Sequence, residues 1–176
     1  MRGKTAFLFI ACFFLFSFAK VNTTSKEKIN WLTIEEVQLK AEKESKPVII
    51  DLYTNWCYWC KVMDKKTYNN SKVIEYVNKH FYAVKLNAET KEKLNWNKKE
   101  YLYTQSNKVN EFSVYITDGQ LSFPTTVIFP DIKKVPAAIP GFLEPKDMEA
   151  VLKYFGEGKY KTQNFEEFSK QFKNEW

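Results

Sequence analysis

Residues 48–61 read VIIDLYTNWCYWCK, an apolar run that leads into two cysteines spaced C-x-x-C. The run 48–53 is rich in β-branched residues, which predicts a buried strand at the centre of a sheet. A helical pattern follows the cysteines to about Lys66. This order of strand, cysteine pair and helix predicts that Cys57 and Cys60 lie where a helix begins.

The segments around this stretch predict an α/β domain. Thr33 and Glu36 have the spacing of a capping box, so a helix is expected from there to about Glu44. Because helical segments connect the second strand to the first, the two strands should be parallel. The further elements that we expect are a helix over 73–78, a strand over 81–86, a helix over 111–116, strands over 125–129 and 135–139, antiparallel to each other, and a helix over 145–155.

Two segments fall outside this regular pattern. Residues 88–110 are polar and are expected to form an insertion or a loosely helical excursion. Near the C-terminus, aromatic residues recur at helical spacing, at Phe165, Phe168, Phe172 and Trp176. We expect this stripe to pack on the domain as an added helix. The alternative is that it forms a dimer or partner surface.

The N-terminus has the pattern of a signal peptide. Arg2 and Lys4 provide positive charge, and the apolar run over 6–18 is short for a membrane span. The run ends at small residues and predicts cleavage after Ala19, which makes residues 1–19 a signal peptide and the protein an exported, periplasmic or otherwise extracytoplasmic one. The alternative is an uncleaved membrane anchor.

Length and composition indicate one domain with a packed core. The chain has 176 residues, of which 44% are hydrophobic and 17% aromatic. We expect the domain to span 20–176, with a core over about 31–155 and a C-terminal extension over 156–176. The net charge is +6, but the lysines are mixed with glutamates and form no concentrated basic stripe. Nucleic acid is therefore not an expected partner.

The cysteine count favours a reactive pair. There are three cysteines, and Cys12 lies within the predicted signal peptide, which leaves Cys57 and Cys60. A disulfide that closes so short a loop adds little stability, although an inert structural disulfide remains an alternative. Zinc needs four ligands, and His80 is the one histidine available to the pair. Haem of the c type needs a histidine where Lys61 stands. No metal or other cofactor is expected.

Three of these segments together resemble the thioredoxin family. Residues 51–57, followed by Cys60 and Lys61, resemble its active-site segment; residues 85–87 resemble its second strand, and 123–125 its cis-proline loop. The chain is similar in particular to exported bacterial thioredoxin-like proteins and to the reductase domain of the transmembrane disulfide reductase system. The resemblance implies a thioredoxin fold, with a central mixed β-sheet flanked by helices, an insertion before the cis-proline strand and a C-terminal helical extension.

The position of the cysteines on the helix suggests their roles. A cysteine at the first turn of a helix lies at the positive end of the helix dipole, near unpaired N–H groups, and both favour the thiolate. Cys57 is therefore the expected nucleophile. Cys60 lies on the same helix face, should be more shielded, and is the expected resolving thiol. The expected activity is thiol-disulfide exchange on protein or peptide disulfides, with reduction as the favoured direction.

The resemblance implies roles for four residues around the pair. Asp51 would be a partly buried carboxyl with a raised pKa that takes the Cys60 proton through water, and Lys85 would face it from the next strand. The alternative is that Asp51 lies at a solvated edge. A cis bond between Phe123 and Pro124 would place the backbone of Phe123 where an extended substrate can pair with it. Phe123 is larger than the residue usual there, so substrate preference should differ.

Three aromatic residues, Trp56, Tyr58 and Trp59, are expected to shape a substrate-docking patch. Tyr58 and Trp59 replace the Gly-Pro of thioredoxin, and the alternative is that all three belong to the core. The competing function is a redox-inactive binding module that holds a partner protein in the thioredoxin groove. The chain is expected to be a monomer, and the resemblance adds a membrane-embedded electron donor to its candidate partners.

Overall fold

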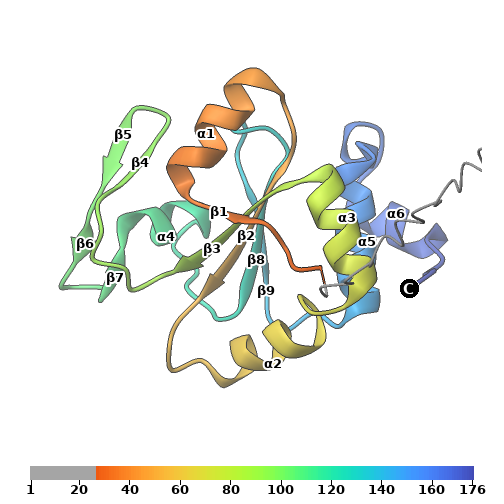
Figure 1. Cartoon of the computed structure of the whole chain (residues 1–176), viewed down its shortest axis with the longest axis horizontal. Helices are drawn as coiled ribbons and strands as arrows, with labels where there is room; N and C mark the ends of the chain where they lie inside the picture. The colour runs from red at the N-terminus through yellow and green to blue at the C-terminus, as the bar shows by residue number, and fades with distance from the viewer. Residues whose placement is uncertain (1–26) are drawn as a thin grey trace, which may run out of the picture.

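Five strands form a mixed sheet through the middle of the molecule (Figure 1), in the spatial order β1 (Trp31–Leu32), β3 (Tyr82–Asn87), β2 (Val48–Tyr53), β8 (Thr125–Phe129) and β9 (Ala137–Pro140). This computed structural model describes residues 27–176, so the predicted signal peptide and Cys12 lie outside the described residues. The central strand β2 is parallel to β3 and antiparallel to β8, as expected. β9 is antiparallel to β8.

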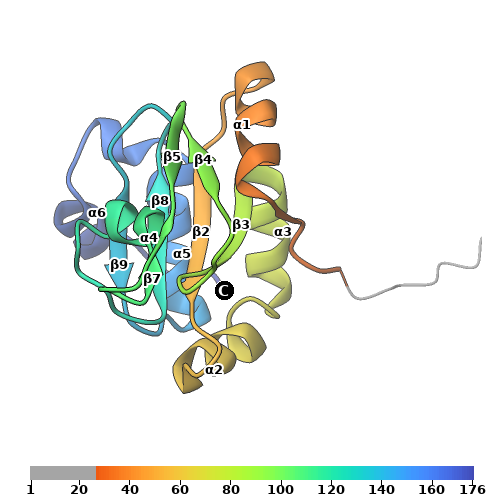
Figure 2. The same ribbon diagram turned by 90° about the vertical axis from the view of Figure 1, so that its left-hand side faces the viewer.

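Helices cover both faces of this sheet (Figures 1 and 2). Their bounds are α1 (Ile34–Lys43), α2 (Tyr58–Lys66), α3 (Ser71–His80), α4 (Glu111–Ile116), α5 (Pro145–Gly156) and α6 (Phe165–Gln171). Apolar residues of α1 and α4 pack on one face, and those of α2, α3 and α5 on the other. Within residues 27–176, no helix has the length and apolar character needed to cross a membrane.

Alternation along β2 divides its side chains between two cores. Ile49 packs in the core under α3 and α5, whereas Ile50 packs in the core under α1 and α4. Asp51 has the same parity as Ile49 and therefore points toward the side that α2, α3 and α5 cover. This parity decides which groups can surround its carboxyl.

Helix caps explain where α1 and α3 begin. The Thr33 and Glu36 side chains form the predicted capping box of α1. Asn70 caps α3 by accepting hydrogen bonds from the backbone of Lys72 and Val73, so the helix starts before the apolar pattern at 73–78 and runs on to His80.

The segment 88–110 forms two β-hairpins, so the expectation of a loosely helical excursion is wrong. The first hairpin pairs β4 (Leu94–Trp96) with β5 (Lys99–Tyr101), and the second pairs β6 (Tyr103–Thr104) with β7 (Val109–Asn110). Asn97 and Lys98 turn the first hairpin with φ angles of 49° and 66°. Positive φ at both turn positions is the geometry of the tightest hairpin turns.

One aromatic residue anchors the first hairpin to the domain. Trp96 is 1% exposed and packs between Phe112 of α4 and Phe129 of β8, with ring centroids 5.6 and 4.9 Å away. The polar segment therefore contributes a large side chain to the core that α1 and α4 cover.

The C-terminal extension packs on its own domain, as expected, although its helix is shorter than the aromatic spacing predicts. α6 ends at Gln171, so Phe172 and Trp176 lie beyond it. Phe168 is buried, and Phe172 and Trp176 pack against the core of α3 and α5. The helix ends early because the following backbone binds elsewhere: the Glu149 carboxylate accepts hydrogen bonds from the Glu175 and Trp176 N–H groups.

Candidate active site

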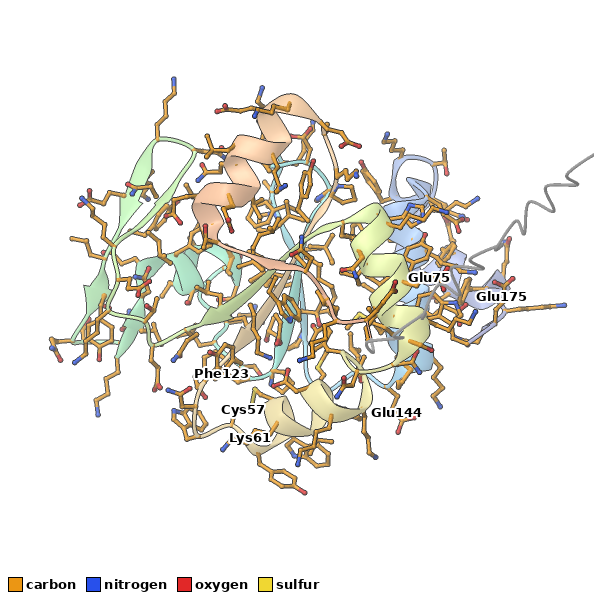
Figure 3. All side chains as sticks on the ribbon, viewed as in Figure 1. Cys57, Lys61, Glu75, Phe123, Glu144 and Glu175 are labelled. Carbon is orange, nitrogen blue, oxygen red and sulfur yellow. A yellow bond between two sulfur atoms is a disulfide. The ribbon has the colours of Figure 1, made fainter. Side chains whose placement is uncertain are left out.

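The cysteine pair lies where β2 ends and α2 begins (Figure 3). Cys57 is the N-cap of α2 and forms a disulfide with Cys60, with a Cα–Cα distance of 5.4 Å. The Cys60 N–H donates to the Cys57 sulfur at 3.0 Å. In the reduced protein this N–H and the helix N-terminus favour a thiolate at Cys57.

Whole-residue exposure does not distinguish the two cysteines, and the expectation that the Cys60 sulfur is the more shielded stays a prediction. Each residue is 4% exposed. The disulfide holds the two sulfurs against each other. Only the position of Cys57 at the N-cap separates the two residues chemically.

Asp51 is buried on β2, the strand that precedes the pair, and is bound to Lys85. The register of β2 and β3 places the two residues opposite each other, and Lys85 Nζ donates to Asp51 Oδ2 at 2.9 Å. Asp51 is 2% exposed, which rules out a solvated edge. Burial raises the pKa of Asp51 to about 6, and the Lys85 ammonium limits this rise.

Asp64 is a member of this charged cluster that the sequence pattern did not reveal. Lys85 also donates to Asp64, so one ammonium joins two carboxylates. Together these carboxylates raise the pKa of Lys85, although burial alone would lower it. The available signal was the position of Asp64 four residues after Cys60, one turn along the same helix face.

The aromatic residues beside the cysteines are on the surface and not in the core. Trp56, Tyr58 and Trp59 are 68%, 70% and 55% exposed. The Trp56 indole N–H donates to Glu89 at 2.9 Å, and its ring meets the Phe123 ring edge to face at 5.9 Å. Large exposed aromatic side chains in one place are typical of an interaction site.

A small hollow lies next to the cysteines. The Phe123-Pro124 peptide bond is cis and precedes β8. Trp59, Phe123, Pro124, Gly141 and Phe142 line a volume of about 340 Å³. The Gly141 N–H donates to the Pro124 carbonyl at 2.8 Å, which holds the two loops together. The structure thus brings the predicted docking residues Trp59, Phe123 and Pro124 to one opening.

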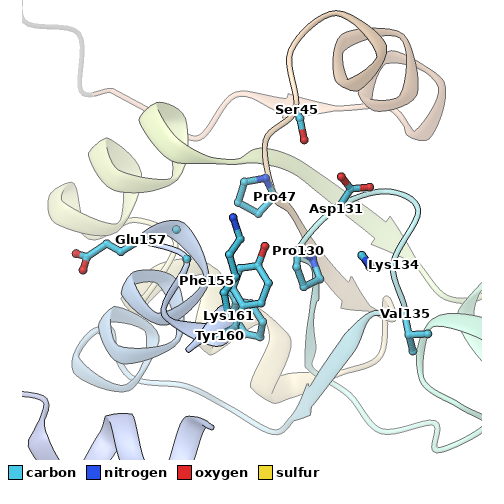
Figure 4. A pocket seen from close by; sticks show the side chains of 12 residues that line it. Ser45, Pro47, Pro130, Asp131, Lys134, Val135, Phe155, Glu157, Tyr160 and Lys161 are labelled. Atoms are coloured by element: carbon cyan, nitrogen blue, oxygen red, sulfur yellow. The ribbon is translucent and has the colours of Figure 1, made fainter. Parts of the chain in front are cut away.

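A larger hollow lies away from the predicted site (Figure 4). Its volume is about 1010 Å³, and it is lined by residues that include Pro47, Pro130, Tyr160 and Lys161. Pro47 precedes β2 and Pro130 follows β8, so this hollow lies at the end of the sheet opposite Cys57. None of the predicted site residues lines it. Within residues 27–176, no group of three or more histidine, cysteine, aspartate or glutamate side chains is placed to hold a metal ion.

Comparison with known proteins gives the family. A family model described as "Thioredox_DsbH: Protein of unknown function, DUF255" matches residues 18–173. The chain belongs to this family. The matched range contains the cysteine pair, Asp51, Lys85 and the cis-proline loop.

Solved structures confirm the thioredoxin fold. A thioredoxin-fold protein from Helicobacter pylori is 22% identical, with a TM-score of 0.55 over 72% of this chain and 79% of that one. A protein titled "DsbH Oxidoreductase" is 13% identical, with a TM-score of 0.55 over 80% of this chain and 93% of that one. The predicted fold class and the predicted resemblance are both confirmed, and the chain combines a fold found in disulfide oxidoreductases with a C-x-x-C pair.

Matches to curated sequences are short. "Spermatogenesis-associated protein 20" of Mus musculus is 26% identical over 95 residues, which are 52% of this chain and 12% of that protein. "Uncharacterized protein B0495.5" of Caenorhabditis elegans is 31% identical over 55 residues, which are 31% of this chain and 8% of that protein. The chain spans about a tenth of the length of the curated relatives it matches.

Proposed function

We propose that this Thioredox_DsbH family member is an extracytoplasmic thiol-disulfide oxidoreductase that reduces disulfides in proteins or peptides. One observation carries the proposal. The C-x-x-C pair begins α2, and side-chain contacts between α2 and β3 connect this helix to the buried Asp51, whose pKa is about 6. A group with a pKa in this range can accept and return a proton near neutral pH. An inert structural disulfide has no use for such a group.

In the first step the Cys57 thiolate attacks one sulfur of a substrate disulfide. A bond forms between Cys57 Sγ and that sulfur, the substrate S–S bond breaks, and the other substrate sulfur leaves as a thiolate. The helix N-terminus and the Cys60 N–H stabilise the attacking thiolate. The product is a mixed disulfide between Cys57 and the substrate.

In the second step Asp51 acts as the general base for Cys60. The Cys60 thiol loses its proton to the Asp51 carboxylate, and the resulting thiolate attacks Cys57 Sγ. The Cys57–Cys60 disulfide forms, the mixed disulfide breaks, and the proton on Asp51 becomes available to the leaving substrate sulfur. Two electrons have passed from the dithiol to the substrate disulfide, and a dithiol donor must then reduce the pair again.

Surface aromatic residues and the cis-proline loop support the docking of an extended substrate. Trp56, Tyr58 and Trp59 surround the pair and keep most of their surface free. The Phe123 backbone precedes β8 at this end of the sheet, where a substrate strand can add by main-chain hydrogen bonds. The hollow beside Pro124 can take one side chain of that strand.

Two parts of the proposal, export and the direction of electron flow, are supported by the sequence alone. The predicted signal peptide supports an extracytoplasmic site of action, where protein disulfides are abundant. Asp51 and Lys61 match the reductase type of active-site segment, and no histidine lies between the cysteines as in strong oxidants. A membrane-embedded dithiol donor fits this location, and the domain spans residues 20–176 after cleavage.

Equilibration with glutathione and turnover of a disulfide peptide test this function together. The reduced protein should convert the peptide to free thiols stoichiometrically, and its equilibrium with glutathione should place the pair on the reducing side of glutathione. The Cys57→Ser variant is the matched control and should convert none. If the reduced wild-type protein binds the peptide without thiol exchange, the redox-inactive binding module is the correct function.

A further inference from the structure

The outer face of α2 carries aromatic residues at its cysteine end and lysines along the rest of its length. Tyr58 and Trp59 expose most of their surface. Lys61, Lys65 and Lys66 are exposed as well. At 3.6 residues per turn, these five side chains fall within about half of the helix circumference, so they form one continuous surface. We call this surface the α2 face.

The lysines of the α2 face have no carboxylate partner in the part of the chain that the structure describes. None of the three forms an ion pair there. Asp64 is the one acidic residue of α2, but it lies outside the α2 face and binds Lys85. Glu144 lies near the far end of α2, since the Thr67 hydroxyl donates to the Leu143 carbonyl, yet it pairs with none of these lysines (Figure 3). The α2 face therefore keeps the positive charge of its three lysines.

Helix stability does not account for the lysine nearest the cysteines. Lys61 lies near the first turn of α2, at the positive end of the helix dipole, where acidic residues are the stabilising ones. α1, α4, α5 and α6 each carry an acidic residue in the first turn, and α2 carries none. Lys61 lies one turn after Cys57 and would favour its thiolate, so a role beyond the pair has to be argued from Lys65 and Lys66.

Lys65 and Lys66 lie too far from the pair to act strongly on its thiols. With a rise of 1.5 Å per residue, Lys65 is about 12 Å along the helix from Cys57, which exceeds the Debye length of about 8 Å at physiological ionic strength. An extended peptide rises about 3.3 Å per residue, so it covers this distance in about four residues. Side chains two to four residues from a substrate cysteine can therefore lie over the α2 face while that cysteine is bonded to Cys57.

We propose that the α2 face recognises disulfides flanked by carboxylates, so that the substrate is a protein or peptide with acidic side chains about two to four residues from the cysteine that Cys57 attacks. The inference rests on the proposed function, because it names the substrate class of the same cysteine pair. Tyr58 and Trp59 supply contact area beside the sulfurs, and the lysines attract carboxylates from a distance. An anionic membrane would fit the same charges, but it would cover Tyr58 and Trp59 where a substrate has to dock.

Two double variants separate the α2 face from the net charge of the protein. Lys65→Glu with Lys66→Glu reverses the charge of the face, and Lys40→Glu with Lys43→Glu on α1 is the matched control. Both pairs are exposed, lie in the last turn of their helix and form no ion pair within the described range 27–176. α1 lies at the opposite end of the molecule from α2 (Figures 1 and 2). The two variants therefore change net charge and helix-end charge equally and differ in place.

The measurement is kcat/KM for three disulfide peptides of equal length that carry acidic, neutral or basic residues near the cysteine. At low salt the wild type should reduce the acidic peptide on the order of tenfold faster than the basic one, and this ratio should approach one as salt is added. Lys65→Glu with Lys66→Glu should abolish or reverse the preference. Lys65→Arg with Lys66→Arg should keep it, and the α1 control should match wild type. The neutral peptide shows any change in the chemistry itself.

The outcomes separate this inference from the function on which it rests. Equal rates for the acidic and basic peptides with the wild type overturn the substrate class and leave the proposed function standing. Equal changes of the ratio in the α1 and α2 double variants overturn the role of the α2 face. A wild-type protein that reduces none of the peptides overturns the proposed function, while binding of Cys57→Ser to the same peptides still decides the charge preference. Binding to phosphatidylserine vesicles that the α2 variant alone loses, without a peptide preference, assigns the face to a membrane and overturns the inference.

Discussion

At the residue scale, the two cysteines have the same exposure and differ in their place on the helix. Cys57 caps α2, and its sulfur accepts the Cys60 N–H. Cys60 lies within the first turn of α2. We therefore expect Cys57 to be the residue that attacks a substrate disulfide and Cys60 to be the residue that releases the product.

This difference predicts opposite behaviour of two serine variants. Cys57→Ser should abolish disulfide reduction, whereas Cys60→Ser should accumulate mixed disulfides with substrates because the resolving thiol is missing. Mass spectrometry of the protein after incubation with a disulfide peptide measures the trapped species. Trapping by Cys57→Ser alone, or equal trapping by both variants, would show that the roles are assigned wrongly.

Asp51 links the site to stability, and the sign of the effect follows from its pKa. The folded-state pKa of about 6 is above the ordinary value of 3.8, so the folded protein binds the proton more tightly than the unfolded chain. The Asp51 carboxyl makes its complete contribution to the free energy of unfolding below about pH 4, and this contribution is lost as the pH rises through 6. Asp51→Asn should therefore raise the free energy of unfolding at pH 7 by at most about 3 kcal/mol, with no gain near pH 3.

The same variant should lose activity while it gains stability. Turnover should fall by about tenfold or more because the amide cannot take the Cys60 proton. Asp64→Asn is the control for stability, since the Asp64 side chain is 40% exposed and its ion pair with Lys85 is partly screened. A loss of activity of no more than about twofold would contradict the role of Asp51 as base. Denaturant unfolding at pH 7 and pH 3 measures the change in the free energy of unfolding.

At the element scale, the parts nearest the cysteines could be predicted from the sequence because their signals are local. β-branched runs, the capping box at Thr33 and the cysteine spacing each act within a few residues. The hairpins at 88–110 could not be predicted, because Trp96 finds its partners Phe112 and Phe129 far along the chain. The turn of the first hairpin also carries no glycine: Asn97 and Lys98 adopt positive φ.

The residues of the candidate site also divide into those that could be predicted from the sequence and those that could not. Asp51 and Lys85 were predicted from a family resemblance, and the register of β2 and β3 brings them together. Asp64 joins the site through its contact with Lys85 of β3, and its place one turn after Cys60 is the only local signal for it. The sequence therefore located the centre of the site, and tertiary packing added the groups that tune it.

The first hairpin should stabilise the domain without taking part in the chemistry. Trp96→Ala removes a 1% exposed indole and should lower the free energy of unfolding by about 3–5 kcal/mol. Leu102→Ala, in the same segment but 48% exposed, is the matched control and should change it by less than about 0.5 kcal/mol. Denaturant unfolding measures both. Equal stability of the two variants would mean that the hairpin is not part of the core.

At the scale of the whole molecule, the C-terminal extension closes the core on the side of α3 and α5. Phe168 packs on Tyr154 of α5 with ring centroids 5.3 Å apart, and Trp176 packs on Tyr76 of α3 at 5.5 Å. Glu149 is fully buried, and the backbone N–H groups of Glu175 and Trp176 satisfy its carboxylate together with Lys153. These contacts cover the aromatic stripe within one chain, which favours a monomer.

Truncation after Gly158 tests this arrangement. It should lower the free energy of unfolding by a few kcal/mol, because it removes four aromatic side chains that pack on the core, Tyr160, Phe168, Phe172 and Trp176, and the Glu149 carboxylate loses its backbone donors. A Glu149→Gln change in the truncated chain should recover part of this loss, since a neutral amide is less costly to leave without those donors. Thermal unfolding and sedimentation should show a less stable protein that is monomeric before and after truncation. Unchanged stability with the dissociation of an oligomer would show instead that the extension belongs to an interface between chains.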